Sequence, residues 1–517
     1  MGSARLLGKT FASMLAASLA VTAAVAGAVV GCSSTSSSGT RDGGNDTATD
    51  GTSSDVEVDV SVVDAGPDVQ QDPNVYPAKH HPIPQVPDLG GPVLKNPHVV
   101  TVTFNYVVVD AGVHDSGTPD TAVSDDSGLD ATTGEGGPTE AGPVDSGVPV
   151  DAGSDGGPPA GSDPFADYLE AFGDKITTTP WWTAALGAYG VGPGTGGVHI
   201  RLPDALPGTP GQTISNSSLS DDQIQQLIQA EVMAGVFPQP TDDTIYVIYF
   251  PASTIINSLG GISCMQFEGY HGAAGSVPTA DGTPAAYAVI PRCPQFAAGD
   301  VGLEELTTET ASHEIAEASS DPQTDTDPAY YLFTNDAWVF YGQGSGGEIG
   351  DLCAGIDVSA YSANGFTVQR IWSNSAAAAS HDPCEPTDDL MQIYYNAAVE
   401  TQTIVDSMGQ KSDGYVVVPR GTTQNFTVDV FSAAALPSEL SFYVGVPVQM
   451  ASDPTQLSPI ATGVTAALSM TSGHNGSVAT LAITASNSSA LGDTYFVVRS
   501  VLSPTDYHDW PVILHVK

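Results

Sequence analysis

One short segment, SHEIAEASSDP, carries the residue types best suited to chemistry in this chain of 517 residues. The spacing of apolar residues predicts a helix from Leu303 to Asp321, because Pro322 cannot continue it. On such a helix His313 and Glu317 lie one turn apart and point the same way. An imidazole and a carboxylate placed like this can hold a divalent metal. Glu314 then lies where it can take a proton from a bound water.

The second acid of this H-E-x-x-E segment stands where the helices of zinc hydrolases carry a second histidine. A carboxylate is a harder ligand that lowers the net charge of the site. Zinc remains the favoured metal, but manganese and calcium become closer competitors. The spacing alone is weakly specific, and the simple alternative is an exposed helix that bears five glutamates.

A third ligand must come from another part of the chain, and GGEIGDLC at 346–353 is the best source. Its glycines permit sharp turns, and either Glu348 or Asp351 supplies an oxygen donor. Three weaker candidates, for which surface or capping roles are the alternative, are Asp321, His271 in a GYHG turn and His381. Two aromatic residues that could line a cleft, although core positions are commoner, are Trp182 and Tyr270.

Four cysteines follow residue 260, and no C-x-x-C pair occurs among them. Sequential pairing, Cys264 with Cys293 and Cys353 with Cys384, closes the shortest loops. We therefore predict two disulfides, each worth about 3 kcal/mol through loop entropy. A zinc site made of all four thiolates is the alternative, and it lacks the usual ligand spacing.

The N-terminal 31 residues predict the cellular compartment. Two basic residues precede an apolar run at 11–30 that ends in Val-Val-Gly-Cys, followed by serines. This order is typical of a bacterial lipoprotein signal peptide in which Cys32 receives the lipid; a transmembrane helix is the alternative. We expect a protein of the bacterial cell envelope that is joined to the membrane through its N-terminal lipid. Ser33 after the cysteine favours the outer membrane or cell surface over the inner membrane.

The net charge of −46 lies mostly in segments of low complexity. Residues 32–90 are rich in Ser, Thr, Gly, Asp and Pro, and we predict a disordered stalk. Residues 110–163 carry acids at a spacing of five without Lys or Arg, which fits neither a helix nor a strand. This tract is predicted to be a solvated insertion, with a calcium-binding repeat as the alternative. The negative charge argues against nucleic acid as a partner.

The remaining segments indicate two folded parts. Predicted strands at 98–109 and 244–250 alternate with predicted helices at 164–176, 179–190 and 219–235, which is typical of an α/β domain. Later segments are short, alternating and β-branched, which predicts an all-β sandwich of immunoglobulin-like type. The predicted order is a signal peptide at 1–31, a stalk at 32–90, an α/β domain at 91–400 with its insertion, and a sandwich at 401–517.

Several motifs occur in a fixed order along the chain: NPHVVTVTFNY, PWWTAALGAYG, SCMQFEGYHG, SHEIAEASSDP, EIGDLCAG and QRIWSN. This order resembles the exordium or phosphate-induced protein family of plants and its bacterial relatives. The resemblance covers roughly residues 91–384 without the acidic insertion. It implies an extracellular α+β domain with a zincin-like helix, whose motif positions are His313, Glu314, Glu317, Glu348, Asp351 and Cys353. The insertion and the DPQTDTDP run after the helix depart from the pattern.

We therefore predict a lipid-anchored, metal-dependent hydrolase, a peptidase of the zincin type that acts on a peptide or a cell-wall polymer. Its general base is Glu314. Its metal ligands are His313, Glu317 and either Glu348 or Asp351. The alternative is a non-catalytic surface interaction or wall-binding protein that holds a structural metal or none.

Overall fold

The structure is a computed structural model that describes residues 71–105, 163–206, 211–297, 302–342, 346–356, 360–384, 393–405, 409–448 and 453–517. The predicted signal peptide at 1–31, the lipidation site Cys32 and residues 110–162 of the acidic insertion lie outside these ranges. Within these ranges, no helix is both long enough and apolar enough to cross a membrane.

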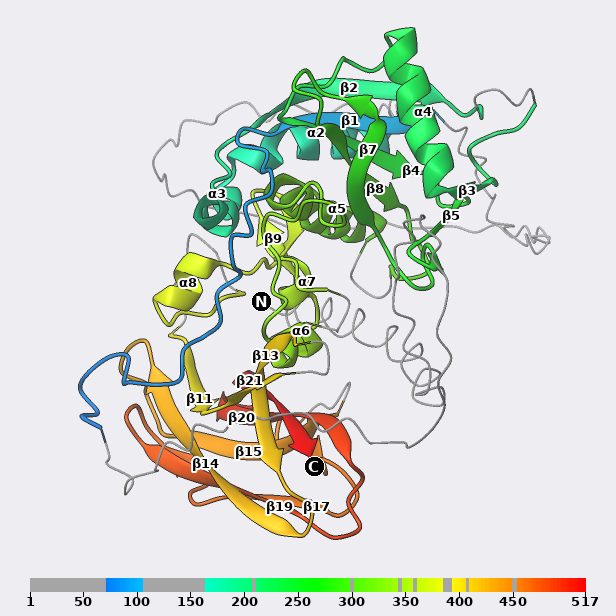
Figure 1. Ribbon diagram of the computed structural model, residues 1–517. Coiled ribbons are helices and arrows are strands. Elements are labelled where there is room, and N and C mark those ends of the chain that lie inside the picture. The colour runs from blue at the N-terminus through cyan, green and yellow to red at the C-terminus, as the bar shows by residue number, and fades with distance from the viewer. Residues whose placement is uncertain are drawn as a thin grey trace, which may run out of the picture.

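A five-stranded mixed sheet organises the first folded part (Figure 1). Its strand order is β2-β1-β4-β8-β7. Neighbours from β2 to β8 are parallel, and β7 is antiparallel to β8 at the edge. The bounds are β1 (His98–Asn105), β2 (Thr195–Pro203), β4 (Thr244–Phe250), β7 (Tyr270–Pro278) and β8 (Pro284–Pro291).

Both faces of this sheet are covered, which explains why β4 reads as an unbroken apolar run. Alternate residues of β4 belong to different cores: Val247 packs on the side of α2 (Pro164–Lys175) and α5 (Leu303–Ser320). Ile248 packs on the opposite side, against α4 (Asp221–Ala234).

Helix α5 runs through the interior and carries the H-E-x-x-E segment. It begins after Gly302, ends before Asp321, and packs Ala311 and Ile315 into the core. Its glutamates at 309, 314 and 317 are buried as well. The alternative of an exposed acidic helix is therefore wrong.

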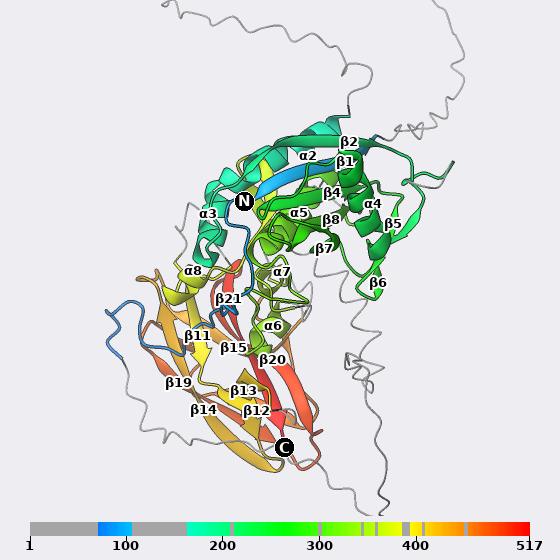
Figure 2. The same cartoon turned by 45° about the horizontal axis from the view of Figure 1, so that its top comes forward.

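Shorter elements surround this core. A hairpin packs on α5, and two short helices lie between the mixed sheet and the C-terminal part (Figure 2). These elements are β9 (Ala360–Ala363), β10 (Phe366–Gln369), α6 (Asp336–Tyr341) and α7 (Asp351–Ala354). The others are α3 (Pro180–Leu186), α8 (Asn374–Ala378), β3 (Ser218–Ser220), β5 (Ile255–Ser258) and β6 (Gly261–Ile262).

The C-terminal part is all β, as the sequence predicts. One sheet has the order β11-β14-β19-β17: β11 (Tyr395–Val399), β14 (Thr422–Ser432), β19 (Val478–Ala485) and β17 (Val464–Leu468). The other has the order β12-β13-β21-β20-β15-β16, and β18 (Ser472–Gly473) also pairs with β15. Its bounds are β12 (Gln402–Val405), β13 (Lys411–Val418), β21 (Asp506–Val516), β20 (Gly492–Ser503), β15 (Leu440–Pro447) and β16 (Leu457–Ser458). Strand β11 begins before the predicted boundary at 401.

Both predicted disulfides are present. Cys264 is bonded to Cys293 and Cys353 to Cys384, with Cα atoms 5.2 and 5.5 Å apart. The thiolate zinc site is therefore excluded, because these sulfurs bond each other. The second disulfide ties α7, next to the EIGD segment, to the chain after α8.

The stalk prediction is wrong for its last twenty residues. Residues 71–90 run from the sandwich to β1 (Figure 1), and Ala78, Ile83 and Val86 are buried in the main core. The backbone N–H of Gln71 donates to Gly476 O at 3.0 Å. Because this proline-rich segment forms no regular element, its apolar residues pack singly and leave no periodic signal.

Candidate metal centre

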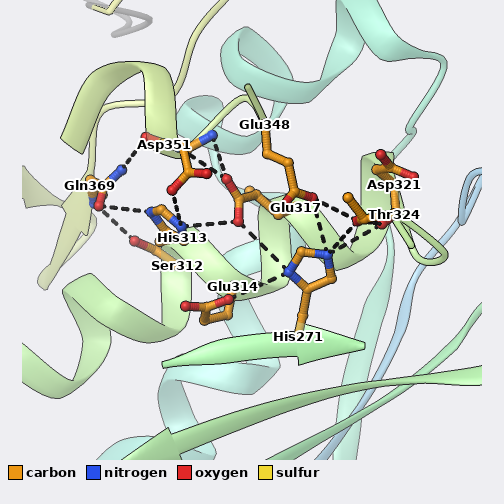
Figure 3. A network of polar contacts seen from close by, with 12 residues as sticks. His271, Ser312, His313, Glu314, Glu317, Asp321, Thr324, Glu348, Asp351 and Gln369 are labelled. Carbon is orange, nitrogen blue, oxygen red and sulfur yellow. Dashed lines mark hydrogen bonds and ion pairs between the residues drawn. The ribbon is translucent and has the colours of Figure 1, made fainter. Parts of the chain in front are cut away.

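Three separate parts of the chain bring six ionisable side chains together (Figure 3). Helix α5 supplies three of them, edge strand β7 supplies one, and the EIGD segment, which ends at the first residue of α7, supplies two. The six side chains are His271, His313, Glu314, Glu317, Glu348 and Asp351.

The predicted pair on α5 is in contact. His313 Nε2 lies 3.0 Å from Glu317 Oε2, one helical turn away, and the two side chains are only 14% and 3% exposed. The regular spacing of the helix is enough to produce this contact.

A glutamine from hairpin strand β10 orients His313. Gln369 Oε1 lies 2.9 Å from His313 Nδ1, and the Gln369 amide nitrogen donates to Gly350 O at 2.9 Å. Because Oε1 can only accept, Nδ1 carries a proton, and Nε2 is the ring nitrogen left to bind a metal once it is deprotonated. Metal-binding histidines are commonly oriented by such a partner. The QRIWSN motif begins at Gln369, but its contact with His313, 56 residues away, could not be predicted from that motif.

The EIGD segment lies directly against α5. Glu317 Oε1 accepts hydrogen bonds from the backbone N–H groups of Gly350, at 2.9 Å, and Asp351, at 3.0 Å. A Cβ on Gly350 would lie 2.7 Å from Glu317 Oε1 and 2.8 Å from His313 Nδ1. A glycine is needed here because backbone and side chains approach too closely for any larger residue.

Both sequence candidates for the third ligand are within reach of the pair. Asp351 Oδ1 lies 3.9 Å from His313 Nε2. Glu348 extends toward the other end of the cluster, where its Oε1 accepts a hydrogen bond from Thr324 Oγ1 at 2.8 Å. The EIGD segment therefore contributes two donors rather than one.

His271 is more central than the sequence analysis predicted. It lies on β7 and not in a turn, with Nδ1 3.5 Å from Glu314 Oε2 and 3.7 Å from Glu317 Oε2. Its Nε2 lies 3.2 Å from Glu348 Oε1. Gly269 does not form a turn but leaves space for the Glu314 side chain, since a Cβ there would lie 2.7 Å from Glu314 Oε1.

The remaining candidates lie outside the cluster or at its border. His381 follows α8, where its backbone N–H donates to Ala376 O. Trp182 and Tyr270 are buried core residues, with hydrogen bonds to Gly192 O and Asp221 Oδ1. This core role is the commoner one for such aromatic residues, as expected from the sequence.

Two further buried carboxyl groups border the cluster. Asp321 ends α5 and accepts a hydrogen bond from the Ala329 N–H at 2.9 Å, and burial raises its pKa to about 7. Burial raises the pKa of Glu268 to about 8, and nearby His313 lowers it only in part. Glu268 lies within the SCMQFEGYHG motif, but the spacing of that motif gives no sign that Glu268 borders the α5 cluster.

The charges of the cluster are strongly coupled. Burial disfavours charged imidazoles, but the carboxylates outweigh it and hold the pKa of His271 and of His313 well above the usual range. Burial raises the pKa of Asp351 and of Glu317. Burial would also raise the pKa of Glu348, but His271 and Thr324 bring it below its ordinary value. The buried carboxylates are therefore stabilised by any positive charge in the cluster, whether an imidazolium or a bound cation.

The donor set fits a divalent cation. Two groups of three residues each offer ligand atoms within 4.8 Å of one another: His271, Glu317 and Glu348, and His313, Glu314 and Glu317. Imidazole nitrogen and carboxylate oxygen suit zinc and manganese, and the oxygen majority suits the harder ions.

No family model and no curated protein matches this chain. Among solved structures, domains 4 and 5 of the S-layer protein SbsC match with a TM-score of 0.14 and 18% identity, over 23% of this chain and 46% of that chain. Domains 1–6 of the same protein match with a TM-score of 0.14 and 19% identity, over 24% of this chain and 14% of that chain. The chain thus spans less than half the length of either match, and the low similarity carries no argument about function.

Proposed function

We propose that this protein is a metal-dependent hydrolase of zincin-like type that cleaves peptide bonds in the bacterial cell envelope. The observation that carries the proposal is the convergence of His313 and Glu317 with the EIGD carboxylates, beside Glu314 on the same helix. His271 adds a donor that the sequence motif does not contain. The motifs that resemble the exordium family are a second support.

A bound cation would supply Lewis acidity and a water of lowered pKa. His313 would bind it through Nε2, since Gln369 holds the Nδ1 proton. Glu317 would bind through Oε2, since its Oε1 is held by two backbone N–H groups. Glu314 would accept a proton from the attacking water, and Gly269 leaves room for it, because a Cβ there would lie 2.7 Å from Glu314 Oε1.

The two disulfides support an oxidising compartment outside the cytoplasm. We propose that the chain is anchored through a lipid on Cys32, at the outer membrane or cell surface. The sandwich would then act as a spacer or an immunoglobulin-like binding module.

The second candidate function is a non-catalytic surface protein in which the cation is structural. The observation that favours it is burial: the His271 and Glu317 side chains are only 7% and 3% exposed, which leaves little access for a polymer. Under this function the cluster would bind metal tightly without turnover.

The two functions are separated by comparing the full-length protein with Glu314→Gln. Full length is needed because residues 71–90 contribute to the core. We expect bound metal in both proteins and cleavage of a peptide library by the wild type only. His381→Gln is the matched control and should behave as wild type. Metal in both proteins without cleavage by either would favour the structural role, and no metal would refute both metal-bound functions.

A further inference from the structure

The cluster holds more donors than one cation needs. The two groups of three residues that could bind a metal share a single member, Glu317. Asp351 lies beside the second group, 3.9 Å from His313. Three carboxylates and two imidazoles are thus arranged around one central glutamate. Structural and catalytic zinc sites generally use three or four protein ligands for one ion.

Glu317 lies between the two groups of possible ligands and contacts both imidazoles. Its Oε1 is occupied by the two backbone N–H groups of the EIGD segment. Its Oε2 is 3.0 Å from His313 Nε2 on one side and 3.7 Å from His271 Nδ1 on the other. The same oxygen therefore faces both imidazoles, from α5 and from β7, as Figure 3 shows.

Each of the two imidazole and carboxylate pairs, His313 with Asp351 and His271 with Glu348, is oriented by a different neighbouring residue. On one side, Gln369 orients His313 and binds the backbone that carries Asp351. On the other side, Thr324 Oγ1 lies 2.8 Å from Glu348 Oε1 and 3.2 Å from His271 Nε2. Two independently oriented imidazole and carboxylate pairs are more than a single ion requires.

The charges of the cluster also favour two divalent cations over one. The side chains of Glu314, Glu317, Glu348 and Asp351 are 3% to 17% exposed, so their charges are poorly solvated. When both imidazoles are neutral metal ligands, one divalent cation would leave two of the four carboxylate charges without compensation, whereas two divalent cations match all four.

We propose that the cluster binds two divalent cations bridged by Glu317, one held with His271 and Glu348 and the other with His313 and Asp351. The ions would lie about 3.5–4 Å apart, as in other two-metal hydrolases. Glu314 then remains the base, so this inference rests on the proposed function and deepens it. A paired centre suits displacement reactions in which both the attacking and the leaving atom carry negative charge.

The test is titration of the metal-free full-length protein with Mn²⁺ alone, followed by equilibrium dialysis and electron paramagnetic resonance. We expect two Mn²⁺ per chain and a signal broadened by coupling between the ions. His271→Gln and Asp351→Asn should each retain one ion with an uncoupled six-line signal. Glu314→Gln and the control His381→Gln should retain two. Circular dichroism and disulfide mapping check that each variant is folded.

Saturation of the wild type at one Mn²⁺ with an uncoupled signal would overturn this inference, whatever the variants do. If such a protein still cleaved peptides through Glu314, the proposed function would stand without the second ion. Two coupled ions without any cleavage would uphold the paired centre and refute the hydrolase.

Discussion

Two buried polar clusters in this molecule differ in their charge balance. In the sandwich, Arg499 and Asp509 form a paired contact with two N···O distances of 2.7 Å, and a third guanidinium nitrogen donates to Pro454 O. In the α5 cluster, four carboxylates surround two imidazoles. The first cluster is complete without a ligand, whereas the second gains from added positive charge. Charge imbalance therefore separates a ligand site from a structural pair.

The largest expected effect is on turnover. Glu314→Gln removes the proposed base and should lower peptide hydrolysis by about 10²–10⁴-fold. Metal content should stay at the wild-type level, because the ligands are other residues. Single-turnover cleavage and metal analysis of the same sample measure both effects. Unchanged cleavage would remove Glu314 from the mechanism.

A substitution in the Arg499–Asp509 pair should lower the stability of the fold and leave metal binding unchanged. Asp509→Asn leaves the buried Arg499 without its counter-charge and should lower the free energy of unfolding by about 3–5 kcal/mol. Metal binding at α5 should not change at temperatures where the variant is folded. Urea unfolding and Mn²⁺ dialysis test the two halves of this prediction. A loss below 1 kcal/mol would argue that the pair contributes little.

Gln369→Leu tests whether Gln369 fixes the orientation of His313 on α5. The substitution removes the acceptor for His313 Nδ1 and should weaken metal binding about 10–100-fold, as for other outer partners of metal-bound histidines. Gln369→Glu keeps the acceptor and should restore much of the affinity. Equal affinity in Gln369→Leu and wild type would mean that the contact with Gln369 does not contribute to metal binding by His313.

The smallest effect concerns a single carboxyl far from the metal cluster. Burial, with help from Glu400, raises the pKa of half-buried Asp429 to about 6, while Lys79 opposes this. The stability from its bound proton is present below pH 3.8 and is lost as pH rises through about 6. Asp429→Asn stays neutral, so relative to wild type it should gain about 1 kcal/mol between pH 4 and pH 7.5, after allowance for solvent screening. Urea unfolding at both pH values measures this, and an equal difference at the two pH values would contradict it.

The sequence reveals those parts of the site that depend on local spacing. His313 and Glu317 follow from helical geometry, β4 from its apolar run, and the disulfides from the shortest loops. His271 was underrated because its role depends on the register of an edge strand against α5, which no local pattern encodes.

Roles that depend on tertiary contacts could not be predicted from the sequence, even where a motif such as QRIWSN contains the residue. Gln369 reaches His313 only after the hairpin folds onto α5, and residues 71–90 pack by isolated apolar contacts. The exposed-helix alternative failed for a related reason. An acidic helix looks solvated in sequence, and only the surrounding layers bury it.

The most direct test of the metal centre is anomalous diffraction from crystals of the full-length protein grown with Mn²⁺. We expect anomalous density next to Glu317 Oε2, between the imidazoles of His271 and His313. Density elsewhere, or none at this cluster with the metal in excess, would contradict the account.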